Sequence, residues 1–377
     1  MGVIYMNTNN TFAHDLVIFL GRMEPPTVAH CASIMEALKH GKFVMVGLGT
    51  HNSPRTVKNP WNTEERIEML KSAIPIQFHS RLVFVGLEDF PNDSEWVANV
   101  GGLARATARQ LVGKEDNIAI LAHQKDKSTY YVDYFKFLKA TIPFNEVKLD
   151  NMQAVLSATK IRELMFTGYL GLCAPALPAG VLEWIGNWIG SEAHQYVQEE
   201  WDEAIKYEKM FHNVPYKNTN CLTADSVVIQ SGHILLIQRA ESPGKGLWAL
   251  PGGHVDNTES GFEASLRELL EETCIKVPKK VLVGSHYASK WYDDPNRSLR
   301  CRITGLYGRT VTNANFYKLN DQEALARVKA GSDAKVAKWV PIDVFLNEMK
   351  PLMFEDHYNI GSDAIKLVPD NITTALL

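Results

Sequence analysis

Residues 253–275 read GHVDNTESGFEASLRELLEETCI and are the most informative stretch of the chain. Apolar spacing predicts a helix from Gly261 to Thr273. Glu268, Glu271 and Glu272 are spaced i, i+3 and i+4, so one helix face presents three carboxylates. Carboxylates this close together require a cation, and hard oxygen ligands select Mg²⁺ or Mn²⁺. Such a cluster can neutralise a diphosphate and activate a water for attack on phosphorus. The alternative is a solvated helix face.

The stretch resembles the Nudix box, G-x5-E-x7-R-E-U-x-E-E-x-G-U, at every position except Cys274, where the box has its second glycine. The resemblance implies that the three glutamates bind metal and that Glu271 and Glu272 are catalytic. It also implies structural roles for Gly253, Glu259 and Arg267, with an ion pair between the last two that fixes the loop to the helix. If the backbone at Cys274 is left-handed, cysteine costs roughly 1 kcal/mol relative to glycine.

Stretches around the box are similar to the ADP-ribose pyrophosphatase-like branch of that family. They are GKGLWALP at 244–251, DPNRSLRCR at 294–302, Asp333-Ala334, and FEDH at 354–357. The resemblance implies ADP-ribose as substrate, with Arg297, Arg300 and Arg302 recognising phosphate or ribose. The same arginines also fit the exposed charges of a strand. Asn296 and Cys301 replace the family's usual glycines, so the substrate loop is expected to differ.

The N-terminal half alternates strands with helices. Strands are predicted at 16–20, 43–48, 81–87 and 117–123, with helices from His30 to Leu38, at 62–72 and at 96–111. This order predicts an α/β, doubly wound parallel sheet. Ligands of such sheets lie beyond the carboxyl ends of the strands. The loops at 21–30, 49–59 and 123–128 should therefore converge on one site.

Two stretches of this half carry nucleotidyltransferase motifs. GRMEPPTVAH at 21–30 resembles the (H/T)-x-G-H signature of the adenylyltransferase superfamily, and LSATKIR at 156–162 resembles its partner I-S-x-T-x-x-R. Ala29 replaces the usual glycine, and Met23-Glu24 replaces a Phe-Gln pair. The resemblance implies that ATP is a substrate. Its triphosphate would be held by Thr27, His30, Ser157, Thr159 and Arg162, with Arg22 bridging to the acceptor phosphate and with Thr27, His30 and Arg162 catalytic. Hydroxyls at a helix N-terminus suit phosphate.

Three more stretches resemble the archaeal-type nicotinamide mononucleotide adenylyltransferases: NPWNTEER at 59–66, NDSEWV at 92–97 and KDKSTYY at 125–131. The resemblance implies that the mononucleotide is bound by Arg66, Asp93, Trp96, Lys125 and Asp126. Asp93 would accept a hydrogen bond from the carboxamide, and Trp96 would stack on the cationic ring. A core aromatic is the other reading of Trp96. Whether the nicotinamide or the nicotinate form is preferred stays open.

The two halves together resemble the family of bifunctional nicotinamide mononucleotide adenylyltransferase/Nudix hydrolases. The resemblance implies formation of NAD and pyrophosphate from ATP and the mononucleotide, hydrolysis of a nucleoside diphosphate derivative such as ADP-ribose, and Mg²⁺ or Mn²⁺ at both sites. Two alternatives remain. One is another mononucleotide adenylyltransferase fused to a Nudix domain, and the other is a Nudix-type regulator that senses NAD metabolites.

The expected domains are a nucleotidyltransferase domain at 14–190, a helical linker at 191–220, and an α+β Nudix domain with a mixed sheet at 221–370. Strands of the last are predicted at 223–229, 233–239, 281–289, 300–309 and 337–341.

The composition of the 377-residue chain restricts the partners and the cellular compartment that we expect for it. A net charge of −4 offers no field for gathering nucleic acid. The five cysteines are scattered, which favours a reducing cytoplasm, and we expect neither export nor a membrane span. No Walker A or G-x-G-x-x-G motif supports a kinase or dehydrogenase. A homo-oligomer is compatible with this composition.

Overall fold

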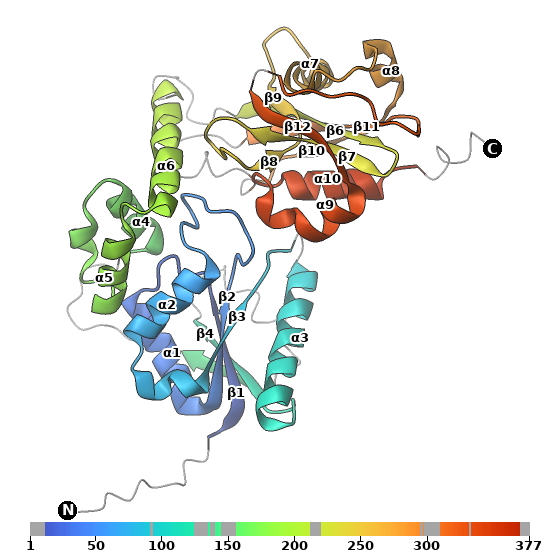
Figure 1. Ribbon diagram of the computed structural model, residues 1–377. Helices are drawn as coiled ribbons and strands as arrows, with labels where there is room; N and C mark the ends of the chain where they lie inside the picture. The colour runs from blue at the N-terminus through green and yellow to red at the C-terminus, as the bar shows by residue number, and fades with distance from the viewer. Residues whose placement is uncertain are drawn as a thin grey trace, which may run out of the picture. The chain divides into compact units, whose positions relative to one another are not determined.

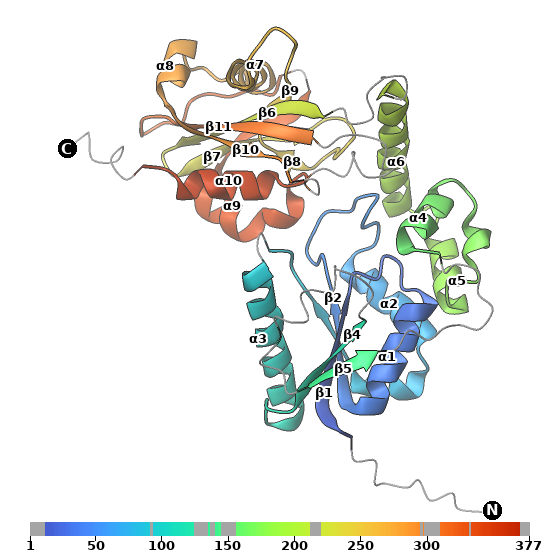
Figure 2. The same cartoon turned by 180° about the vertical axis from the view of Figure 1, so that it is seen from behind.

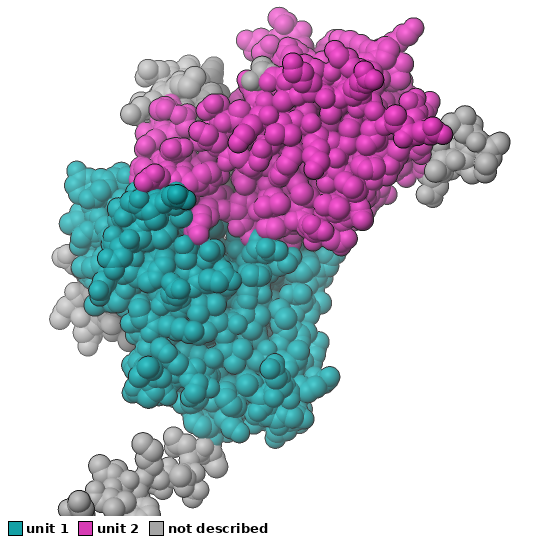
Figure 3. Space-filling model, viewed as in Figure 1, with its two compact units in different colours: residues 1–52, 59–194 teal, residues 53–58, 195–377 magenta. Residues whose placement is uncertain are grey.

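The structure is a computed structural model that describes residues 12–90, 93–123, 135, 140–144, 156–211, 220–294, 297, 310–331 and 333–369. The chain divides into two compact units, coloured separately in Figure 3. The N-terminal unit comprises Met1–Asn52 and Asn59–His194, and the C-terminal unit comprises Ser53–Lys58 and Gln195–Leu377. The helical linker expected at 191–220 contains α6 (Glu192–Phe211), most of which is grouped with the C-terminal unit.

The N-terminal unit is built on a five-stranded parallel sheet of order β3-β2-β1-β4-β5, as Figure 1 shows in part. Its strands are β1 (His14–Gly21), β2 (Gly41–Leu48), β3 (Leu82–Gly86), β4 (Ile118–His123) and β5 (Ala140–Phe144). Leu16, Val17 and Ile18 of β1 are fully buried, as expected for a parallel strand covered on both faces. The predicted doubly wound sheet is confirmed, although β5 had no counterpart in the sequence analysis.

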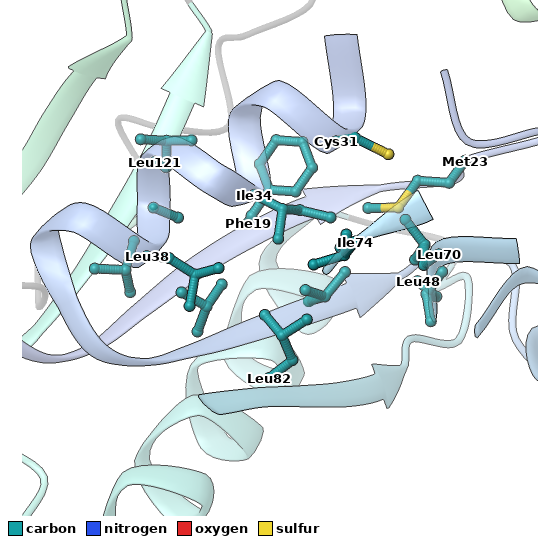
Figure 4. Close-up of a cluster of buried hydrophobic side chains, with 14 of the residues drawn as sticks. Phe19, Met23, Cys31, Ile34, Leu38, Leu48, Leu70, Ile74, Leu82 and Leu121 are labelled. Carbon is teal, nitrogen blue, oxygen red and sulfur yellow. The ribbon is translucent and has the colours of Figure 1, made fainter. Parts of the chain in front are cut away.

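Helices cover both faces of this sheet (Figure 2). On one face, α1 (Val28–His40) and α2 (Thr63–Ala73) enclose the apolar cluster drawn in Figure 4. On the other face, α3 (Asp93–Val112) packs on Leu16, Ile18 and Ile120. The unit also contains η1 (Ile76–Arg81), α4 (Ala158–Phe166), η3 (Leu170–Cys173) and α5 (Ala179–Trp188). Among the described residues, no helix is long and apolar enough to cross a membrane.

The C-terminal unit has a mixed sheet, as predicted. Its main order is β10-β11-β6-β7-β12, with β8 beside β7 and β9 beside β6; β11 and β6 run parallel, and the other pairs are antiparallel. The strands are β6 (Cys221–Gln230), β7 (His233–Arg239), β8 (Trp248–Ala249), β9 (Gly252–His254), β10 (His286–Tyr292), β11 (Thr310–Lys318) and β12 (Ala334–Pro341).

Helices again lie on both faces of the sheet. One face carries α7 (Gly261–Thr273), whose bounds match the prediction. The other carries α9 (Ile342–Glu348), η4 (Lys350–Leu352) and α10 (His357–Lys366). The strand expected at 281–289 is wrong in its first part, because Pro278 is the N-cap of a short helix, α8 (Lys279–Gly284), in which only Leu282 is buried. The strand expected at 300–309 lies outside the described residues.

Two candidate active sites

The loop between β1 and α1 carries the first candidate site. Thr27 is the N-cap of α1, and its hydroxyl accepts a hydrogen bond from the backbone N–H of His30 at 3.4 Å. In return, Nδ1 of His30 accepts from the backbone N–H of Thr27 at 3.0 Å and contacts its hydroxyl at 2.9 Å. Because Nδ1 accepts, Nε2 is the ring nitrogen that can donate to a ligand. A positive helix end and an imidazole donor therefore stand together at a strand end.

Helix α4 supplies the second part of this site. Ser157 is its N-cap and accepts from the backbone N–H of Lys160 at 3.2 Å, while Thr159 is exposed in the first turn. Arg162 is 7% exposed and donates to the Thr159 hydroxyl at 3.3 Å and to the backbone carbonyl of Glu24. Arg162 thus ties the second motif to the loop of the first, a contact that the sequence analysis did not predict.

A buried ion pair lies under the loop. Arg66 of α2 is 1% exposed, and its Nε lies 3.2 Å from a carboxylate oxygen of Glu24, which is 2% exposed. Nη1 of Arg66 also donates to the backbone carbonyls of Arg22 and Gly49, at 2.6 and 2.7 Å. The described contacts of Arg66, which the sequence analysis placed at the mononucleotide, are therefore to the protein itself. Arg22 is exposed at the same loop.

Burial shifts the pKa values of Glu24, Arg66 and Arg162. It raises the pKa of Glu24 to about 8, although Arg66, the backbone N–H of Trp61, Arg162 and Arg22 oppose the shift. Burial also lowers the pKa of Arg162 to about 10 and that of Arg66 below its ordinary value. The sequence analysis missed Glu24 as a site residue. Its only signal was the departure from the expected glutamine, and the buried arginine partners appear only in the folded chain.

The residues assigned to the mononucleotide are placed in part. Asp93 is exposed in the first turn of α3. Trp96 is half-buried, packs against the apolar cluster under α3, and meets Phe135 edge-on with ring centroids 6.1 Å apart. This packing is the core contact that the alternative reading of Trp96 described. Lys125 and Asp126 lie outside the described residues.

The loop and helix of the second candidate site are held by Arg267. Nε and Nη2 of this arginine contact the two carboxylate oxygens of Glu259 at 3.1 and 2.6 Å, and Nη2 also donates to the carbonyl of His254 at 3.0 Å. The expected ion pair is confirmed. A Cβ at Gly253 would lie 2.4 Å from the Glu268 carboxylate, so a larger residue there would displace that carboxylate from its present position. Cys274 caps α7 with φ 42°, which confirms the left-handed position anticipated for it.

The three glutamates differ in their surroundings. Glu268 and Glu271 contact Nη1 of Arg267 at 2.7 and 3.2 Å. Glu272 is 5% exposed and accepts from the backbone N–H of Gly252 at 2.9 Å. Burial raises the pKa of Glu272 to about 8, and the nearby charges of Glu268 and Asp333 add to the shift. Burial likewise raises the pKa of Glu268.

These carboxyls suit a divalent cation. In the described part of the chain, no three acidic, histidine or cysteine side chains already form a metal-ligand group. Burial is the main cause of the raised pKa values of Glu272 and Glu268, and the negative charge of Glu268 adds to the shift at Glu272. Oxygen donors with excess negative charge are what Mg²⁺ and Mn²⁺ require.

Of the three arginines expected to contact the Nudix substrate, Arg297 alone lies among the described residues. Arg297 is 5% exposed and pairs with Asp356 through two contacts of 2.9 Å. The adjacent His357 is buried, its Nδ1 accepts from the backbone N–H of Leu250 at 3.0 Å, and burial lowers its pKa to about 4. The stretches at 294–302 and 354–357 are thereby joined. Arg300 and Arg302 lie outside the described residues.

Comparison with known proteins finds relatives of each half and of the whole. Residues 18–164 match the family described as Cytidylyltransferase-like, and residues 220–360 match the NUDIX domain. The nicotinamide/nicotinic acid mononucleotide adenylyltransferase of Acinetobacter baylyi is 28% identical over 190 residues, which are 50% of this chain and 95% of that protein. The ADP-ribose pyrophosphatase of Methanocaldococcus jannaschii is 32% identical over 145 residues, 38% of this chain and 73% of that protein.

Two solved structures from Francisella tularensis match along nearly the whole chain. One of them is a bifunctional NMN adenylyltransferase/ADP ribose pyrophosphatase complexed with AMP and a manganese ion. It is 27% identical, with a TM-score of 0.79, and the match covers 94% of this chain and 99% of that one. Both units therefore occur together, in this order, in a known protein.

Proposed function

Since the chain belongs to the Nudix family through its C-terminal half and joins it to a cytidylyltransferase-like half, we propose that it is a bifunctional enzyme of NAD metabolism. One activity transfers an adenylyl group from ATP to nicotinamide mononucleotide, giving NAD and pyrophosphate. The other hydrolyses ADP-ribose with the help of a divalent metal. The observation that carries the first activity is the hydrogen bond from Arg162 to Glu24, which joins two motifs that are far apart in sequence.

In the N-terminal unit, the chain's part in the reaction is to position phosphates and neutralise their charge. The N-termini of α1 and α4 supply backbone N–H groups and positive helix ends for the triphosphate. His30 donates from Nε2, and Arg162 and Arg22 add positive charge. The mononucleotide phosphate then attacks the α-phosphorus in line, and pyrophosphate leaves without a covalent enzyme intermediate. Mg²⁺ accompanies ATP as its counterion.

We assign mononucleotide recognition to the start of α3 and to Lys125 and Asp126, which follow β4 in the sequence and lie outside the described residues. Asp93 accepts from the carboxamide, Trp96 offers an aromatic face, and Lys125 and Asp126 complete the site. The contacts of Arg66 with the loop carbonyls and with Glu24 support an indirect role for this arginine, in which it holds the loop beneath the ligands.

In the C-terminal unit, Glu268, Glu271 and Glu272 would hold Mg²⁺ or Mn²⁺. When bound, the metal polarises the diphosphate and lowers the pKa of a water nucleophile. Arg267 keeps the loop before α7 on the helix through its contact with Glu259. Its Nη1 also contacts Glu268 and Glu271 and holds them in place. Glu271 is 52% exposed, so it is the glutamate most open to a hydrated metal or to substrate.

Cytoplasmic action is part of the proposal, because the cysteines among the described residues are free thiols, as is usual in a reducing compartment. The deciding experiment incubates the full chain with Mg²⁺-ATP and each mononucleotide, and separately with ADP-ribose and with NAD. Chromatography should detect NAD in the first reaction, and AMP with ribose 5-phosphate from ADP-ribose. If another mononucleotide, such as that of flavin, is adenylylated instead, the substrate assignment of the N-terminal unit is wrong.

A further inference from the structure

Glu24 joins the loop between β1 and α1 to two helices. From α2, Arg66 approaches one carboxylate oxygen at 3.2 Å, and the backbone N–H of Trp61, just before that helix, approaches the other at 3.4 Å. From α4, Arg162 donates to the backbone carbonyl of Glu24. Glu24 itself is 2% exposed. A single buried side chain and its carbonyl thus fix the loop that ends at Thr27 and His30.

The preceding residue anchors the opposite side of the loop. Met23 is 1% exposed and lies in the apolar cluster near Leu48 and Leu70, as Figure 4 shows. Its φ of 55° is left-handed, which costs a non-glycine residue roughly 1 to 2 kcal/mol. The strained backbone directs Met23 into the core and leaves Glu24 in the polar network. Two adjacent side chains therefore hold the loop from both sides.

The charges around Glu24 are mostly positive. Arg22 lies on its own loop, Arg66 comes from α2 and Arg162 from α4; the acids facing Arg66 are Glu64 of α2 and Asp89 after β3. The cluster formed by Glu24 and the guanidiniums of Arg66 and Arg162 carries more net positive charge when the Glu24 carboxyl is protonated than when it is ionised. A bound triphosphate would favour the protonated form, because a polyanion disfavours a nearby carboxylate.

We propose that Glu24 is a positioning residue of the adenylyl-transfer site, whose buried carboxyl ties the loop of Thr27 and His30 to Arg66 so that its backbone carbonyl can hold Arg162, and which takes up a proton from solvent when the triphosphate binds. The proposal rests on the proposed function of the N-terminal unit. Burial already places the ionisation of Glu24 within reach of neutral pH, with a pKa of about 8. Binding of ATP should therefore weaken as pH rises through 8, since the ionised carboxylate must first be protonated.

Proton counting on the full chain tests this directly. Isothermal titration of Mg²⁺-ATP at pH 8.5, in buffers of different ionisation enthalpy, should show uptake of about half a proton in the wild type. Glu24→Gln keeps the side-chain volume and one oxygen acceptor, for either Arg66 or the Trp61 N–H, but cannot ionise, so its proton uptake should fall to the baseline of ATP itself. Glu64→Gln removes a carboxylate from an exposed position of the same helix and is the matched control, with wild-type uptake expected.

Kinetics supply the second readout. From pH 7 to pH 9, the KM for ATP should rise about tenfold in the wild type and less than twofold in Glu24→Gln. Glu24→Ala should lose NAD formation at least tenfold at pH 7.5, and Glu24→Gln should restore it. ADP-ribose hydrolysis by the same chains reports whether the protein is folded.

Equal proton uptake in wild type and Glu24→Gln overturns the proposal, as does a tenfold rise in KM in both. A chain that binds ATP with Glu24-dependent proton uptake but forms no NAD refutes the proposed reaction instead. If Glu24→Ala does not fold, the proton uptake of Glu24→Gln compared with that of Glu64→Gln still tests the proposal.

Discussion

Arg297 and Asp356 form a two-point ion pair, in which Nε and Nη2 of the arginine each lie 2.9 Å from one carboxylate oxygen. The arginine is 5% and the aspartate 16% exposed. Burial raises the pKa of Asp356, and the Arg297 charge opposes that rise. A buried carboxylate that loses its partner is strongly destabilising. Removal of either partner should therefore destabilise the C-terminal unit at the start of α10.

Arg297→Met should lower the free energy of unfolding by about 3 kcal/mol, because it leaves the Asp356 carboxylate buried without its counterion. Urea unfolding with a fluorescence readout measures the effect. Lys290→Met is the matched control, since its pair with Asp363 is 48% and 31% exposed and should change stability by less than about 1 kcal/mol. Wild-type stability with a raised KM for ADP-ribose would assign Arg297 to the substrate instead.

His30→Ala should reduce NAD formation by roughly 100-fold or more, because a positioned donor to phosphate is lost. Hydrolysis of ADP-ribose should stay near the wild-type rate, since α7 belongs to the other unit. His40→Ala, at the opposite end of α1, controls for effects on the helix. NAD formation at more than half the wild-type rate would remove His30 from the site.

Glu271→Gln and Glu272→Gln should each abolish ADP-ribose hydrolysis without unfolding the chain, because each removes a metal-binding charge and keeps the side-chain volume. Rates in excess Mg²⁺ and circular dichroism spectra measure the two effects. Asp256→Asn, in the exposed loop before α7, is the control with normal turnover expected. Undiminished hydrolysis by both glutamine variants would mean that the box is structural only.

The raised pKa of Glu272 predicts a pH dependence of stability. In the folded state this carboxyl titrates near pH 8, against an ordinary value of 4.5, so the native state binds more protons between these values. Stability contributed by the neutral carboxyl is present below pH 4.5 and is lost as pH rises towards 8. Thermal unfolding in chelator should show this decline in the wild type, less of it in Glu272→Gln, and its reversal by Mg²⁺. Identical pH curves for both proteins would contradict the assignment.

Cys274→Gly should stabilise the chain by about 1 kcal/mol, because cysteine stands at a left-handed position where glycine has no steric penalty. Chemical unfolding measures the gain. Cys221→Gly is its control, since it lies in extended strand β6 and should gain nothing. A loss of stability at position 274 would show that the thiol makes compensating contacts.

Asp93 predicts preference for the amidated mononucleotide over its acid form by at least tenfold, because a carboxylate accepts from a carboxamide but repels a second carboxylate. Asp93→Asn should reduce the difference in kcat/KM between the two mononucleotides, and Glu95→Gln, on the same helical turn, should leave it unchanged. Comparison of kcat/KM for both mononucleotides measures it. Equal values in the wild type, or no effect of Asp93→Asn, would exclude Asp93 from the site.

The sequence predicted those elements whose pattern is local. Helix α7 matched at both ends, because its apolar stripe is regular and Ser260 with Glu263 forms a capping box. Strand β11 was not predicted, because Thr312, Asn313 and Asn315 are polar in sequence although buried in the sheet. Thr312 and Asn315 find partners on other elements, Asp225 and Ser289 respectively. Burial of a polar residue depends on those partners, which a linear pattern does not contain.

The candidate sites show the same division. Thr27, His30 and the glutamates of α7 lie within short motifs and were predicted. The buried roles of Arg66 and Arg297 were not, because each depends on an acid from another part of the chain, Glu24 and Asp356 respectively. From the sequence alone, an arginine in a polar stretch cannot be distinguished from one that binds a ligand, because its acidic partner is known only from the fold.

The strand order of the N-terminal unit has a consequence for synthesis on the ribosome. Central strand β1 pairs with β2 along one edge and with β4 along the other, so that Leu16 lies opposite both Phe43 and Ile118. A nascent chain that has emerged only as far as α3 presents the second edge of an apolar strand with no partner. Such an edge can pair with another chain. Premature termination before residue 118 should therefore yield fragments that aggregate and require chaperones, although they already contain the β1–α1 loop.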